Sequence, residues 1–186
     1  TDPLGRTTQY VYDARDQQIA MTDADGNRTS YRYDPVGNLV SVTDPLGRIV
    51  RRRYDELDRL TQIDYVAPDL VGHTTRYRYD KTNNLVETTD PLGRITRLSH
   101  DNRDRLVSET RAFGTSDSAT TAYENDLLGN RVARIDANGN RTEYEYDRMN
   151  RRSVVRDALG RETAYAYDSA GNVVSVTDRR GWTTEY

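Results

Sequence analysis

Acidic side chains are the most numerous residues in this sequence that could carry chemistry. The chain has 30 Asp and Glu residues, and many of them recur at regular intervals. Two carboxyl groups at a suitable separation can hydrolyse a glycosidic bond, so a glycosidase site is the first possibility. No acid stands out from its counterparts, because each recurs at the same place in a repeated pattern. We therefore expect no catalytic residue and predict that the chain is not an enzyme.

Two acidic segments look like calcium-binding loops, Asp23–Asn27 and Asp136–Asn140. An EF-hand loop needs a Glu at its twelfth position, where this chain has Asp34 and Asp147. Asp and Asn are also favoured in tight turns, because their side chains hydrogen-bond to nearby backbone groups. We prefer the turn interpretation and expect no metal and no cofactor.

The other candidate groups are also explained without chemistry. His73 and His100 are the two histidines, and there is no Cys. A catalytic or metal role would need further ligands that converge on a histidine, and the sequence offers none, so we expect a structural role. The basic cluster Arg51–Arg53 could bind a phosphate or an acidic partner, although a solvated strand face is the interpretation that we prefer.

The composition limits the class of protein. Only 34% of the residues are hydrophobic, but the net charge is −3 and there are 14 Tyr residues, each of which buries a large area beneath a polar tip. A folded chain without a thick core fits these values better than a disordered one. Acids and bases nearly cancel, so nucleic acid is not favoured as a partner. No apolar run reaches the roughly 18 residues of a membrane-spanning helix.

The elements that carry these residues repeat along the whole chain. Successive units begin at residues 1, 22, 43, 64, 89, 110, 135, 156 and 177. Their length is 21 residues, or 25 residues in the units 64–88 and 110–134. The extra residues fall in the segments 64–73, which includes Pro68, and 110–119. We expect these two insertions to protrude from one rim of the fold and treat 1–186 as one array of about eight and a half units.

Each unit reads as a β-hairpin. In residues 22–42, Asp23–Gly26 and Asp34–Gly37 have the Asp-x-x-Gly pattern of a type I turn. Between these turns, Thr29–Tyr33 alternates with a period of two, and Leu39–Val42 is rich in β-branched residues. The alternation of the second segment is not clean and leaves open which side it buries. The pattern predicts an all-β, antiparallel hairpin meander of about 17 strands, which should form a long curved or spiralling sheet because twist accumulates.

Paired tyrosines mark one strand of each unit and should form rows on one face of the sheet. The pairs are Tyr10/Tyr12, Tyr31/Tyr33, Tyr77/Tyr79, Tyr144/Tyr146 and Tyr165/Tyr167. Three units break the pattern with Arg52/Tyr54, Leu98/His100 and Tyr123/Asn125. Because cross-strand contacts are the unit of sheet stabilisation, we expect local weak points there.

The unit resembles the YD repeat, also called the RHS repeat, in copies such as GNRTSYRYDPVGNL at 26–39 and GRETAYAYDSAGNV at 160–173. The resemblance covers essentially the whole chain. The residues that define the repeat are Tyr10, Tyr12, Asp13, Tyr31, Tyr33, Asp34, Gly37, Tyr54, Asp55, Tyr77, Tyr79, Asp80, Tyr144, Tyr146, Asp147, Tyr165, Tyr167, Asp168 and Gly171.

The resemblance implies a β-sheet strip that spirals into a hollow shell. In bacterial Rhs proteins and Tc toxins such a shell encloses a C-terminal toxic domain, and in teneurins it belongs to an adhesion receptor. We expect a segment of a secreted or surface-exposed bacterial shell whose partners are the rest of that shell and an enclosed cargo domain. An adhesive module that binds glycans or proteins is the alternative. We also expect the chain to be a fragment of a longer protein that self-associates through exposed sheet edges.

Overall fold

The computed structural model describes residues 6–67 and 72–186, and it is all-β. It contains 17 strands and no helix in that part of the chain, and every strand pair with a defined register is antiparallel. The predicted hairpin meander is therefore confirmed. The first five residues of the turn at 1–6, and Pro68 of the first insertion, lie outside the described residues. The long curved or spiralling course of the sheet stays a prediction.

The strands belong to two compact units, which are described separately. Unit 1 comprises Thr1–Asp80 and Glu87–Ile95, and unit 2 comprises Lys81–Val86 and Thr96–Tyr186. The strands up to the boundary are β1 (Gln9–Tyr12), β2 (Gln18–Thr22), β3 (Arg28–Tyr33), β4 (Leu39–Thr43), β5 (Ile49–Tyr54), β6 (Leu60–Val66), β7 (His73–Tyr79) and β8 (Leu85–Thr89). The remaining strands are β9 (Ile95–His100), β10 (Leu106–Arg111), β11 (Ala119–Asn125), β12 (Arg131–Ile135), β13 (Arg141–Tyr146), β14 (Arg152–Arg156), β15 (Glu162–Tyr167), β16 (Val173–Thr177) and β17 (Thr183–Glu185).

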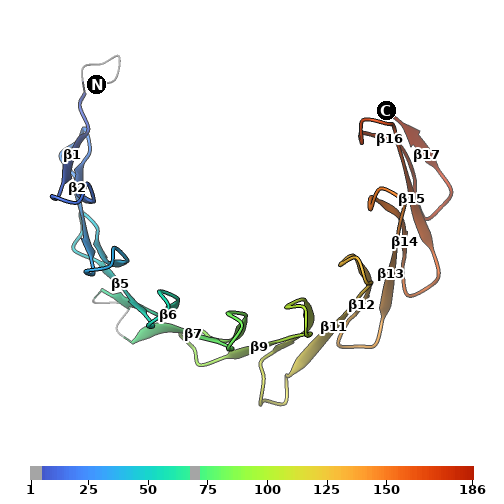
Figure 1. Ribbon diagram of the computed structural model, residues 1–186, viewed down its shortest axis with the longest axis horizontal. Coiled ribbons are helices and arrows are strands. Elements are labelled where there is room, and N and C mark those ends of the chain that lie inside the picture. The colour runs from blue at the N-terminus through green and yellow to red at the C-terminus, as the bar shows by residue number, and fades with distance from the viewer. Residues whose placement is uncertain (1–5, 68–71) are drawn as a thin grey trace. The chain divides into compact units, whose positions relative to one another are not determined.

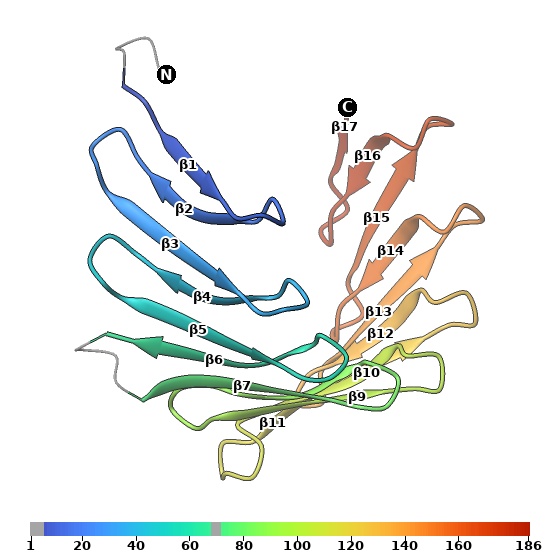
Figure 2. The same cartoon turned by 60° about the vertical axis from the view of Figure 1, so that its left-hand side comes forward.

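Within each unit the strands pair in sequence order. In unit 1, β1 to β7 form a meander, and Figure 2 shows β1 to β6 lying side by side with turns at alternating ends. In unit 2, β9 to β17 form a second meander of the same kind (Figure 1). Successive turns therefore lie alternately along the two opposite rims of the sheet in each compact unit.

Very few side chains are fully covered. Ala20, Ala67 and Ala133 are the buried hydrophobic residues in the described part of the chain, and no polar residue there is buried. Most strand positions are half-buried, and the tyrosine side of the odd-numbered strands is less exposed than the other side. In β3, for example, Tyr31 and Tyr33 are half-buried while Arg32 between them is exposed. The tyrosine pairs lie on one face, as predicted.

A β-bulge accounts for the imperfect alternation of the even-numbered strands. Arg32 faces Ser41 and Tyr33 faces Leu39, so Val40 is the extra residue on β4. Among the described pairings the same shift occurs seven times, with the extra residues Ile19, Val40, Thr61, Val107, Val132, Ser153 and Val174. A bulge places two residues opposite one and increases the local twist, which no simple period of two can describe.

Candidate functional site: the repeated turn and its tyrosine

Two classes of turn connect the strands. Those that follow the paired tyrosines are named Tyr–Asp turns here, and they begin at Asp13, Asp34, Asp55, Asp80, Asp101, Asp126, Asp147 and Asp168. Those that lead to the next unit are named linking turns, and they begin at Asp23, Asp44, Asp90, Asp136, Asp157 and Asp178. Apart from the turn at Asp80, all of them show the same pair of backbone hydrogen bonds, so a single example describes both classes.

The turn at Asp147 shows how the backbone reverses. The Asn150 N–H donates to the Asp147 carbonyl (3.0 Å), and the Asp147 N–H donates to the Arg151 carbonyl (2.9 Å). Asn150 has a φ of 58°, and no positive φ occurs at the preceding turn position. This is a type I turn followed by one left-handed residue, the usual three-residue hairpin loop. The type I prediction is confirmed, and the fourth position favours glycine because its φ is positive, as in Gly37 and Gly171.

The first Asp of a turn accepts hydrogen bonds from its own loop, as the turn at Asp147 shows. Oδ1 of Asp147 accepts the N–H groups of Met149 (2.8 Å) and Arg151 (3.0 Å), and Oδ2 accepts from Nε of Arg151 (2.7 Å). The Arg151 N–H and guanidinium hold the pKa of Asp147 below its ordinary value. The same bonds at Asp101 lower its pKa to about 2, chiefly through the Arg105 guanidinium.

The segments that looked like calcium loops follow this turn pattern. Oδ1 of Asp23 accepts from the Asp25 and Asn27 N–H groups, and its Oδ2 accepts from the Asn27 side chain. Asp136 makes the equivalent bonds to Asn138 and Asn140. Within the described residues, no group of three or more His, Asp or Glu side chains is placed to hold a metal ion.

The fifth residue of a Tyr–Asp turn, which the sequence analysis did not single out, also contacts the next repeat. Its Asn or Arg side chain extends beyond its own Asp to the following Tyr–Asp turn. Nδ2 of Asn38 donates to Oδ1 of Asp58 (2.7 Å), and Nη1 of Arg59 donates to the Asp80 carbonyl (3.1 Å). Further links of these two kinds are Asn84 to Asp104, Arg105 to Asp126, Asn130 to Asn150 and Arg151 to Asp168.

These links alternate along the rim. A turn that has Asn at its fifth position bonds to a side-chain oxygen, and the following turn has Arg and bonds to a backbone carbonyl. Two of the arginines also lie over a tyrosine ring of the next repeat. The guanidinium carbon of Arg59 is 4.9 Å from the centre of the Tyr79 ring, and that of Arg151 is 4.6 Å from the centre of the Tyr167 ring. The signal was present in the sequence as a column in which Asn and Arg alternate.

The second tyrosine of each pair closes the gap between neighbouring hairpins. The β12–β13 ladder runs from Ile135↔Arg141 to Ala133↔Glu143 and ends before the tyrosines. Beyond that point the Tyr146 phenol donates to the Arg131 carbonyl (2.9 Å). The equivalent bonds are Tyr33 to Gln18, Tyr54 to Leu39, Tyr79 to Leu60 and Tyr167 to Arg152.

The remaining predicted residues are placed as follows. Tyr10 and Tyr12 lie on β1 and are 52% and 55% exposed. Tyr31, Tyr77, Tyr144 and Tyr165 are the half-buried first members of their pairs. Burial raises the pKa of Tyr77, with Tyr65 and Tyr79 close enough to add to the effect. The first-strand tyrosines face second-strand valines, for example Tyr144 opposite Val155.

The three irregular repeats have different side chains and contacts at the tyrosine positions. Asn125 donates to the Leu106 carbonyl (3.3 Å) and so replaces the phenol. Nδ1 of His100 is buried and has no hydrogen-bond partner in the described part of the chain. Nη1 of Arg52 is in the same situation. His73 lies at the start of β7 opposite Tyr65. The expected weak points stay a prediction, for which His100 provides the most direct test.

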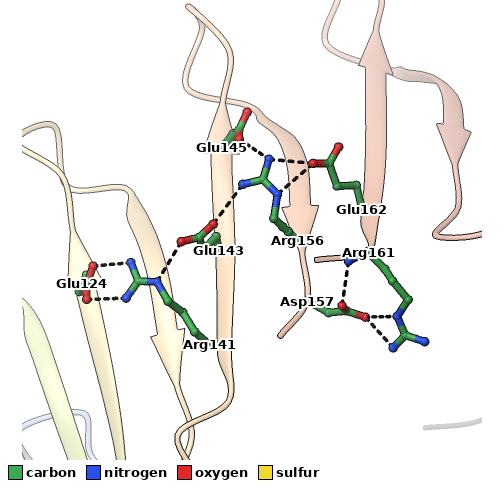
Figure 3. A network of polar contacts seen from close by, with 8 residues as sticks. All are labelled: Glu124, Arg141, Glu143, Glu145, Arg156, Asp157, Arg161 and Glu162. Carbon is green, nitrogen blue, oxygen red and sulfur yellow. Dashed lines mark hydrogen bonds and ion pairs between the residues drawn. The ribbon is translucent and has the colours of Figure 1, made fainter. Parts of the chain in front are cut away.

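The face opposite the tyrosines carries an ionic network in unit 2 (Figure 3). Arg141 binds Glu124 through two bonds (2.6 and 2.8 Å) and Glu143 through Nε (2.9 Å). Its side chain therefore spans β12 at Ala133, which pairs with both glutamates and is 0% exposed. Arg156 continues the network to Glu143, Glu145 and Glu162 at 2.7–3.1 Å. Such half-exposed pairs contribute little singly but fix side-chain positions across five strands.

The hairpins are longer in the two 25-residue repeats, 64–88 and 110–134. Strand β6 continues to Val66, and its ladder with β7 reaches Tyr65↔His73. Strands β10 and β11 similarly pair as far as Arg111↔Ala119. Phe113 in the second insertion lies under the Arg97 guanidinium (3.6 Å). Part of each insertion thus lengthens the strands, and the expectation that the insertions protrude from one rim stays a prediction.

Comparisons with known proteins agree with the repeat. The family described as RHS Repeat matches residues 1–28, 12–45, 33–68, 71–95, 79–116, 126–162 and 152–184. No curated protein sequence matches the chain.

Solved structures with a similar fold include the crystal structure of TcdB2–TccC3–Cdc42, with a TM-score of 0.62 and 17% identity over 92% of this chain and 11% of that chain. The crystal structure of TcdB2–TccC3 without its hypervariable C-terminal region gives 0.61 and 17% over the same shares. A Tc holotoxin pore of Photorhabdus luminescens with a TccC3 mutation gives 0.51 and 16% over 95% of this chain and 12% of that chain. The chain thus spans about a tenth of these proteins, and at such identity the likeness concerns the fold.

Proposed function

We propose, from the premise that this chain belongs to the RHS-repeat family, that it is a wall segment of a β-sheet shell enclosing a C-terminal toxic domain. The observation that carries the proposal is the repeated hairpin, in which each Tyr–Asp turn from Asp34 to Asp147 is bonded to the next one. Such an array can be extended indefinitely, because each unit needs only its neighbours. Its role is mechanical, and we propose no catalytic residue.

The physical basis of a barrier is the continuity of the sheet. Strands about 4.8 Å apart leave no passage for a polypeptide, and each hairpin adds about 10 Å of wall. Tyrosine phenols and turn side chains close the places where the ladders end. The family resemblance and the fold of the TcdB2–TccC3 structures support this proposal. A secreted or cell-surface location in a bacterium follows from it, with the rest of the shell and the cargo domain as partners.

The decisive experiment uses the natural full-length protein. Intact mass spectrometry under native and then denaturing conditions should reveal a C-terminal piece that is cleaved but stays with the shell until denaturation. Limited proteolysis should leave that piece intact in the native protein and degrade it once the shell is unfolded. A C-terminal domain that is digested equally fast with and without the folded shell would contradict the container and favour the adhesive module.

We also propose that the 186-residue chain self-associates through its edge strands. Strand β1 pairs only with β2, and β17 pairs only with β16, among the described pairings. All four residues of β1 are exposed. Unpaired strands are templates for further pairing. Sedimentation velocity over a range of concentrations should therefore show oligomers, and a single monomeric species throughout would contradict this proposal.

A further inference from the structure

Five arginines gather on one face of unit 1. Arg32, Arg53 and Arg78 stand between the two aromatic positions of β3, β5 and β7, or their equivalents, and Arg51 and Arg76 precede the first of these positions in β5 and β7. The register places them on a common face, since Arg32 and Arg51 both pair with Ser41, and Arg53 and Arg76 both pair with Gln62. We call this set the arginine face. It lies opposite the tyrosines.

The arginine face lacks matching negative charge. Asp64 lies 3.8 Å from Arg53, and Glu87 lies 3.3 Å from Arg78. Asp64 is already engaged by the side chains of Gln62 and Thr74. Arg32, Arg51 and Arg76 are exposed and form no ion pair within 4.0 Å in the described residues. Asp64 faces Arg51 in the register and is close enough to Arg76 to interact with its charge, so two carboxylates stand against five arginines on this face. Like charges on neighbouring strands destabilise a sheet, so this face would be more stable with an anion bound.

The fold itself does not require these arginines. In unit 2 the equivalent positions hold Glu124, Glu143 and Glu145, and there Arg141 and Arg156 satisfy the glutamates. The same backbone pattern therefore supports a face whose charges are paired. The unpaired excess of positive charge is specific to unit 1 and points to a ligand from outside that unit.

We propose that the arginine face binds an extended acidic segment of a protein, with carboxylates at alternate positions. Alternate side chains of an extended chain are about 7 Å apart, which is also the spacing of Arg51 and Arg53 along their strand. A guanidinium binds a carboxylate through two parallel bonds. Ser41 lies between Arg32 and Arg51 on this face, and its hydroxyl can bond to a peptide backbone.

Nucleic acid fits the same face less well. Single strands are bound through aromatic side chains on which the bases stack, and the tyrosines of β3, β5 and β7 lie on the other side of the sheet. The proposal goes beyond the shell function and does not depend on it.

The test measures fluorescence anisotropy of a labelled peptide of alternating Glu and Thr, titrated with the 186-residue chain at low salt. Arg32→Gln, Arg51→Gln and Arg76→Gln together should weaken binding by about tenfold or more, since three exposed charge contacts are lost. Arg134→Gln, Arg148→Gln and Arg180→Gln are the matched control, because they change the net charge equally away from the face. The control should bind as the unchanged chain does.

Three results would overturn the proposal: unchanged binding by the first triple variant, an equal loss in the control, or equally tight binding of a peptide with its glutamates in blocks. A single-stranded oligonucleotide of equal charge that binds more tightly would assign the face to nucleic acid instead. The three replaced arginines form no ion pair with the other described residues, so circular dichroism and thermal unfolding of the variant should match those of the unchanged chain.

Discussion

The phenol of Tyr146 donates a hydrogen bond to the main-chain carbonyl of Arg131, 2.9 Å away, where strands β12 and β13 have ceased to pair. One side chain thus replaces the ladder bonds that are lost as the two hairpins separate. The bond recurs between successive repeats, so the second tyrosine of a repeat joins its own hairpin to the preceding one. This assigns different roles to the two tyrosines of a pair.

Tyr146→Phe should therefore destabilise the chain by about 1 kcal/mol, because a carbonyl loses its partner. Tyr144→Phe is the matched control, since no hydrogen bond of the Tyr144 hydroxyl occurs in the described residues, and it should have little effect. Chemical denaturation measures both. Equal losses in the two variants would show that the phenol bond has no special importance.

Asp23→Ala should lower the melting temperature by roughly 2–4 °C, a typical change for one local defect in a chain of this size. The substitution removes bonds from the Asp25 N–H, the Asn27 N–H and the Asn27 side chain. Asp25→Ala, two residues away in the same turn, leaves these acceptors in place. Differential scanning calorimetry should separate the two variants, and an equal shift would contradict the turn mechanism.

Acid should weaken the fold in a defined range of pH. The folded-state pKa of Asp101 is about 2, below its ordinary value of 3.8. A lowered carboxyl pKa stabilises the folded chain above the unfolded value, and that stability is lost as the pH falls through the folded value. The denaturant concentration at the midpoint of unfolding should therefore decrease as the pH is lowered from about 4 to about 2. The decrease should be less steep in Asp101→Asn. An identical slope in the variant would contradict the assignment.

Gly160→Ala should destabilise the chain by about 1–2 kcal/mol, the cost of a left-handed conformation for a residue with a Cβ. Gly160 has a φ of 75°, and an added Cβ would meet nothing within 4 Å, so the cost comes from the backbone alone. Asp16→Gly is the converse change at the same turn position, where φ is 58°. It should leave stability equal or higher, as measured by urea unfolding.

His100→Tyr should stabilise unit 2 by about 1 kcal/mol, by replacing a buried nitrogen without a partner with the side chain that other units use. His100→Phe lacks the hydroxyl and should gain less. Hydrogen exchange should also be faster around β9 and β10 than around β13 and β14 in the unchanged chain. Equal exchange rates in these two pairs of strands would contradict a weak point at His100.

Much of this fold was predictable from sequence because its determinants are local. Asp at the first turn position and Gly at the fourth specify a three-residue loop, and the spacing of the loops leaves strands of the right length. The alternation Tyr31–Arg32–Tyr33 shows which face is more covered. The repeat then multiplies each local signal across the chain.

The interactions between successive repeats could be identified only in the tertiary structure. The partner of Tyr146 depends on where the β12–β13 ladder ends, and the reach of Asn38 to Asp58 depends on how neighbouring turns are placed. The bulge at Val40 shifts the register between these points, so counting residues cannot give the contacts. The hairpins and their faces follow from the sequence alone, because turn and strand preferences are local. The contacts that join one hairpin to the next, and the exposed face that Arg32 and Arg51 share, depend on register and therefore appear only in the folded sheet.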